Sequence, residues 1–83
     1  MDVNQAKGVE QYVKLQQALM LLTTLRWWDR LFKTAKYRQA KEELGNALRI
    51  TSQYIEQAAM PDVVREMLKA LFDAALPEYE RMR

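Results

Sequence analysis

The chain has 83 residues, of which 49% are hydrophobic and 29% are charged, with a formal net charge of +2 and neither cysteine nor histidine. This composition excludes the disordered class of chains, and the absence of cysteine excludes disulfides and thiolate metal sites. The length fits one domain, assigned to residues 1–83, and a domain this small gains stability from oligomerisation. Only two glycines and two prolines occur, which favours a few long helices over a sheet.

The first predicted helix covers residues 9–33. Residues 1–8 before it show no apolar period, and Gly8 weakens helix continuity, so an irregular end is predicted there. Residues 15–32 carry apolar side chains on two faces at helical spacing. The first face holds Ala18, Leu21, Leu22, Leu25, Trp28 and Phe32, and the second holds Val13, Met20, Thr24, Trp27 and Leu31. Because two apolar faces need two neighbours, this helix is predicted to lie at the centre of a bundle and to favour a homo-oligomer.

The second predicted helix covers residues 35–59, with Thr34 as its N-cap. Its apolar register comprises Tyr37, Ala40, Leu44, Ala47, Leu48, Thr51, Ile55 and Ala58. The register continues through Gly45, which would then allow close approach of a neighbouring element. In the alternative interpretation, Gly45 and Asn46 form a turn that splits the segment into two short helices.

The third predicted helix covers residues 61–76. Pro61 disfavours helical conformation at Met60 and suits the first turn of a new helix. Pro77 is expected to kink or stop that helix and to leave residues 77–83 as an irregular end, with residues 78–83 forming either a polar tail or one short extra turn. The predicted core face comprises Val64, Met67, Leu68, Leu71 and Ala75. The fold class is therefore all-α, a small three-helix bundle of two long helices and one shorter helix, completed by oligomerisation.

Catalysis is disfavoured because the commonest general base and the most reactive nucleophile, histidine and cysteine, are both missing. Asp62 and Glu66 are four residues apart on one helix face and are the best pair for a hard cation, but acids in a first helical turn are more simply explained by the helix dipole. We predict no enzyme activity, no cofactor and no metal. The longest uncharged run has eleven residues, whereas a membrane span needs about 20, and no secretory signal is evident. A cytoplasmic protein is expected.

The most informative feature is the charge distribution. Between positions 26 and 41 the chain has six basic residues and one acid, whereas the remainder has seven basic and ten acidic residues. Aromatic residues are interleaved with these cations. The predicted partner-binding residues are Arg26, Trp27, Arg30, Lys33, Lys36, Tyr37, Arg38 and Lys41. Trp28 and Phe32 lie on the first apolar face and are predicted to belong to the core. For the cations, the simplest alternative is a solvated helix end where they offset the helix dipole.

Tryptophan, tyrosine and arginine are the favoured anchors of protein interfaces. We therefore predict a small helical module that binds another protein with an acidic surface, as an adaptor, assembly factor, inhibitor or regulator. The alternative is a nucleic-acid-binding bundle, in which the cations contact phosphates and the aromatics stack on bases.

Overall fold

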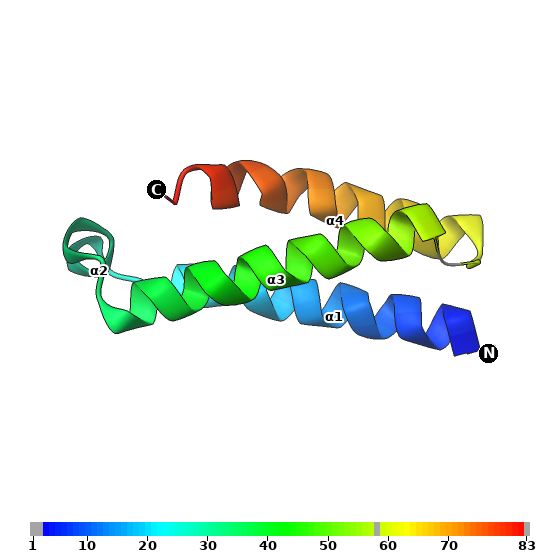
Figure 1. Ribbon diagram of the computed structural model, residues 1–83, viewed down its shortest axis with the longest axis horizontal. Coiled ribbons are helices and arrows are strands. Elements are labelled where there is room, and N and C mark those ends of the chain that lie inside the picture. The colour runs from blue at the N-terminus through cyan, green and yellow to red at the C-terminus, as the bar shows by residue number, and fades with distance from the viewer. Residues whose placement is uncertain (1–2, 58, 83) are drawn as a thin grey trace.

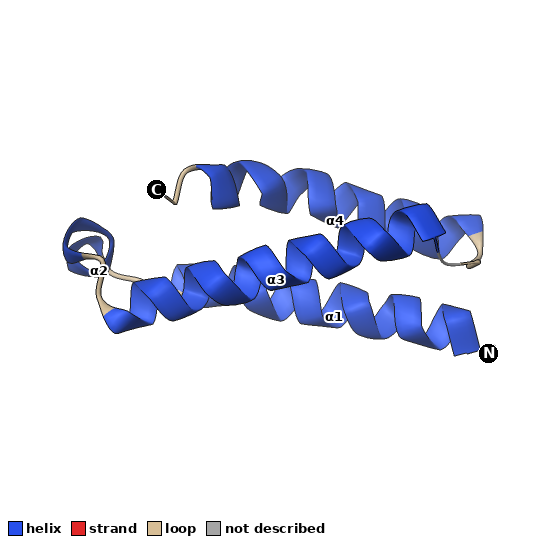
Figure 2. Ribbon diagram, viewed as in Figure 1, coloured by secondary structure: helices blue, strands red, loops and turns tan. Residues whose placement is uncertain are grey.

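The computed structural model describes residues 3–57 and 59–82, and the side chains of residues 3–5 and 57 lie outside the description. Within these ranges the chain forms four helices and no strand: α1 (Val3–Thr23), α2 (Trp27–Phe32), α3 (Ala35–Gln57) and α4 (Asp62–Glu80). The three long helices lie side by side in a rod of 43 × 19 × 15 Å, and the short α2 lies at one end of it (Figures 1 and 2). The predicted all-α bundle is confirmed.

The core lies between α1, α3 and α4, each of which contacts the other two. It contains Leu15, Ala18, Leu22, Tyr37, Ala40, Leu44, Ala47, Leu48, Ala75 and Met82. The predicted register of α3 is confirmed from Tyr37 to Thr51, all of whose predicted apolar positions are buried, whereas Ala58 lies outside the described residues. Helical spacing was sufficient to predict the buried positions of α3, because this helix has a single apolar face.

One buried polar contact links α1 to α3. The Gln11 side-chain amide donates to the Ala47 carbonyl (3.3 Å) and to the Thr51 hydroxyl (3.1 Å). A buried amide without partners is costly, so these hydrogen bonds favour one axial alignment of the two helices over a shifted one.

The prediction of a first helix over residues 9–33 is wrong at both ends. The helix begins at Val3 and ends at Thr23, so the expected irregular segment is helical over residues 3–8; residues 1–2 lie outside the described part. The hydroxyls of Thr23 and Thr24 donate to the carbonyls of Met20 and Leu21, both at 2.7 Å. These bonds satisfy carbonyls at the end of the helix and compete with its continuation.

Thr34 is confirmed as the N-cap of α3, since its hydroxyl accepts the Tyr37 N–H (3.4 Å) and its carbonyl accepts the Arg38 N–H (3.0 Å). Helix α3 is continuous through Gly45 and Asn46, which excludes the alternative with a turn. As predicted, Gly45 permits a close approach. A Cβ atom at this position would lie 3.0 Å from Cε2 of Tyr79.

The third long helix also differs from its prediction. Pro61 occupies the N-cap position of α4, and the helix continues through Pro77 to Glu80. The predicted stop after residue 76 is therefore wrong, and the alternative of one short extra turn describes this end of the chain. Pro77 removes one hydrogen bond in the penultimate turn. The packing of Tyr79 against α3 and the burial of Met82, which is 1% exposed, hold the last turn in place. Among the predicted core residues of α4, Met67 is exposed instead.

Candidate functional site

Helix α2 is organised by one aspartate. The Asp29 carboxylate accepts the Arg26 N–H (3.0 Å) through one oxygen and the Thr34 hydroxyl (2.7 Å) through the other. Its backbone carbonyl accepts the N–H groups of Lys33 and Thr34. Asp29 is 6% exposed. A helix of six residues is too short to be stable alone, so this network at both of its ends holds it in place.

The surroundings of Asp29 favour its charged form. The Arg26 N–H lowers the pKa of the carboxyl below its ordinary 3.8, the Thr34 hydroxyl lowers it further, and the charges of Lys36 and Arg26 act in the same direction, whereas burial opposes them. The chain leaves α2 through Lys33 in the left-handed region, with φ of 50°. This conformation is costly for a lysine and ends α2 two residues before α3 begins.

The apolar side chains of α2 face solvent. Trp27, Trp28, Leu31 and Phe32 are 69%, 42%, 64% and 71% exposed. The prediction that Trp28 and Phe32 belong to the core is therefore wrong, because the break at Thr24 removes them from the register of α1. The second apolar face of residues 15–32 does not meet a neighbouring helix either, since Val13, Met20, Trp27 and Leu31 are all exposed.

The eight predicted binding residues fall into separate places. Arg26, Trp27, Arg30 and Lys33 lie on α2 or at its ends and are exposed. Lys36 is exposed, but its ammonium donates to the Thr24 carbonyl (3.0 Å) and so connects α3 to the end of α1. Tyr37, only 5% exposed, belongs to the core. The last two, Arg38 and Lys41, lie on α3 beside a groove.

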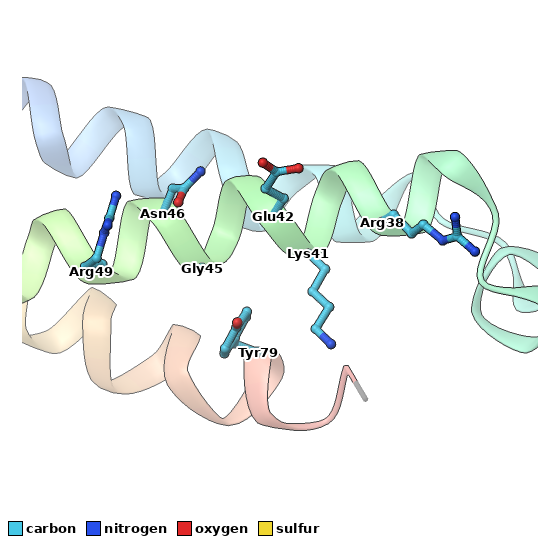
Figure 3. Close-up of a pocket in the computed structure, with 7 residues that line it drawn as sticks. All are labelled: Arg38, Lys41, Glu42, Gly45, Asn46, Arg49 and Tyr79. Atoms are coloured by element: carbon cyan, nitrogen blue, oxygen red, sulfur yellow. The ribbon is translucent and has the colours of Figure 1, made fainter.

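The groove has a volume of about 390 Å³ and lies between α3 and the C-terminal end of α4. It is lined by Arg38, Lys41, Glu42, Gly45, Asn46, Arg49 and Tyr79. Tyr79 points from α4 toward Gly45, Lys41 projects toward the end of α4, and Arg38 extends toward the end of the bundle that carries α2 (Figure 3). The ion pairs of Lys14 with Glu10 and of Arg81 with Glu78 do not involve these cations.

Only Arg38 and Lys41 of the seven lining residues were predicted as binding residues, and among the five others Arg49 and Tyr79 give the groove a further cation and an aromatic ring. Arg49 lies eleven residues after Arg38, which places both on one helix face, and this spacing was available in the sequence. No local signal connects Tyr79 to α3, because Tyr79 lies beyond Pro77 and outside the apolar register predicted for the third helix. The contact exists only through packing.

The candidate pair Asp62 and Glu66 lies exposed near the start of α4. Within the described residues, no group of three acidic side chains is placed to hold a metal ion, and no helix is both long and apolar enough to cross a membrane. What the surface offers is an exposed apolar α2 and a basic groove. No family model matches this chain, and neither does any curated protein or solved structure in the comparisons.

Proposed function

We propose that this protein is a small non-enzymatic module, an adaptor or regulator, whose basic groove on α3 holds an acidic segment of a partner protein. The observation that carries the proposal is the excess of cations in the groove. Arg38, Lys41 and Arg49 line it against the single carboxylate of Glu42. Their charges stay available to a partner, since neither ion pair described above engages them.

The spacing of the cations favours an extended partner over a small anion. Arg38 and Arg49 are eleven residues apart, which corresponds to about 16 Å along the helix axis. A single phosphate or carboxylate cannot contact both guanidinium groups. A peptide with several carboxylates matches them in charge and length, and the half-buried Tyr79 ring adds an aromatic surface for contact. We expect the protein to act in the cytoplasm, where a small domain without cysteine needs no disulfides.

Titration of a fluorescein-labelled polyglutamate peptide, followed by fluorescence anisotropy, tests the groove. We expect the double variant Arg38→Gln with Arg49→Gln to bind about 2- to 30-fold more weakly, because each exposed ion pair contributes about 0.2–1 kcal/mol. The matched control is Lys7→Gln with Lys69→Gln, which removes the same charge from exposed positions elsewhere and should bind like the unmodified protein. An equal loss of peptide affinity in both double variants would show general charge attraction and would contradict the proposal that the peptide binds in the groove.

A parallel titration with labelled oligonucleotides tests the alternative that the protein binds nucleic acid. Affinity for labelled oligonucleotides should fall by roughly 0.7 to 0.9 log units per phosphate contact for each decade of salt. We expect weak binding without sequence preference at physiological salt. Submicromolar affinity, with a salt dependence that corresponds to about four or more phosphate contacts, would favour nucleic acid as the partner.

We also propose self-association through α1. Val9, Val13 and Met20 are exposed and, at about 100° per residue, lie within about 40° of one another on the solvent side of the helix. Such a stripe suits a two-fold contact between copies. Light scattering at micromolar concentration should give a mass above the 9.8 kDa of one chain, and Val13→Ser with Met20→Ser should shift the protein toward the monomer. A mass of one chain at every concentration would contradict this proposal.

A further inference from the structure

The exposed side chains of α2 form one continuous apolar surface at the end of the rod. At about 100° per residue, Trp27, Leu31, Trp28 and Phe32 follow one another around the helix within an arc of about 140°. Asp29 lies on the opposite side, where it is buried by its hydrogen bonds. The helix is therefore amphipathic with its apolar side outward. We call these four residues, together with Arg30 and Lys33, the α2 tip.

The apolar surface is held in a defined arrangement. The rings of Trp27 and Trp28 meet edge to face, with centroids 5.8 Å apart, and the Arg26 guanidinium lies 5.2 Å from the centre of the Trp28 ring. These contacts and the network of Asp29 order the indoles before any partner arrives. A partner then binds without ordering them, which reduces the entropic cost of association.

Cations lie at the edge of this surface. Arg30 follows on the helical wheel about 60° from Trp27, and Lys33 caps the end of α2. Both side chains are exposed, and neither takes part in the ion pairs of the described residues. Tryptophan, phenylalanine and leucine bordered by arginine and lysine make up the residue set of helices that lie in the interface of an anionic bilayer.

The shape of the tip favours a bilayer over a protein groove or a second copy. Among the described helices, α3 alone has its backbone close to that of α2, and α2 extends beyond the ends of the long helices (Figure 1). Anchors at protein interfaces enter fitted pockets and need a concave partner of matching shape. A lipid surface has no fixed shape and covers a convex apolar end directly. We propose that the α2 tip inserts into the headgroup region of a bilayer that contains anionic phospholipids.

Intrinsic fluorescence tests the proposal without a label, because Trp27 and Trp28 are the only tryptophans of the chain. The full chain is titrated with vesicles of phosphatidylcholine plus phosphatidylglycerol and, separately, with vesicles of phosphatidylcholine alone. We expect a blue shift of the emission with the anionic vesicles only. Lipids brominated on the acyl chain should quench this emission, which locates the indoles at the level of the bilayer interface.

Two pairs of variants separate the tip from nonspecific attraction. Leu31→Ser with Phe32→Ser keeps both tryptophans and should weaken partitioning by at least about tenfold. Its control, Val63→Ser with Met67→Ser, removes exposed apolar side chains from the start of α4 and should have no effect. Arg30→Gln with Lys33→Gln should weaken partitioning by about 30-fold, since each cation contributes about fivefold. The variant Lys7→Gln with Lys14→Gln has the same net charge and should retain binding.

Three results would overturn the proposal. One is an emission spectrum that anionic vesicles leave unchanged, and another is an equal loss of partitioning in the tip variants and their controls. The third is a blue shift that grows with protein concentration in the absence of lipid, which would assign the tip to a second copy of the chain. The variants of the groove differ from those of the tip, so failure of the acidic-peptide proposal is distinguishable from failure of this one.

Discussion

Replacement of Asp29 with alanine is expected to abolish the ordered state of α2 while the three long helices stay folded. The carboxylate accepts hydrogen bonds from Arg26 at the start of α2 and from Thr34 beyond its end. Alanine removes both, and a helix of six residues has no other local source of stability of comparable strength. The core of α1, α3 and α4 does not include Asp29 and should be unaffected.

Circular dichroism distinguishes these two parts of the molecule. The near-ultraviolet signal of the Trp27 and Trp28 pair should be largely lost in the Asp29→Ala variant, because the edge-to-face contact needs an ordered α2. The far-ultraviolet helical signal should change little. Asp73→Ala, an exposed aspartate on α4, is the control and should leave both signals unchanged. Retention of the tryptophan signal in the Asp29→Ala variant would show that α2 is held by other contacts.

The same residue makes the order of α2 depend on pH. The pKa of Asp29 in the folded state lies below its ordinary 3.8, so the folded corner binds a proton less readily than the unfolded chain. Its stabilising contribution is therefore complete above pH 3.8 and is lost as the pH falls through the lower folded-state pKa. The tryptophan signal should fade in this acidic range. In the Asp29→Asn variant this part of the pH dependence should be absent.

Replacement of Gly8 with alanine is expected to destabilise the bundle, although alanine is the better helix former. A Cβ at this position would lie 2.7 Å from Cγ1 of Val64, which is itself buried and branched at Cβ and so has little freedom to move. Overpacking of this kind costs about 1–3 kcal/mol, against a gain in helix propensity of about 1 kcal/mol. A net loss of about 1 kcal/mol would lower Tm by about 4–8 °C.

Two further variants test the cause. In the double variant Gly8→Ala with Val64→Ala, the Cγ1 methyl group that the new Cβ would contact is removed. The double variant should therefore be more stable than the sum of the two single effects predicts. Gly45→Ala is the matched glycine change. Its Cβ would meet the Tyr79 ring at 3.0–3.2 Å, but this ring is only half-buried and can shift near the end of α4, so we expect little change in Tm. A full gain of stability in Gly8→Ala would contradict the close contact with Val64.

The all-α class, the N-cap at Thr34 and the core face of α3 follow from the amino-acid sequence alone. These features depend on interactions within a few residues or on a single apolar face, which periodicity reports directly. The position of the basic segment along the chain was equally evident. The sequence did not show that the basic residues divide between α2 and the groove on α3. That division depends on the positions at which α1 and α2 end.

The features in which packing opposes local preference become evident only in the folded molecule. Gly8 and Pro77 are poor helix residues, yet each lies inside a helix, because close contact with Val64 and anchoring by Tyr79 and Met82 outweigh their local cost. Just after the end of α1, the Thr24 carbonyl accepts a hydrogen bond from the Lys36 ammonium, twelve residues away. The break after Thr23 turned an apolar stripe predicted for the core toward solvent. Interactions between distant residues have no periodic signature in the chain, so helical spacing alone could not place the tryptophans.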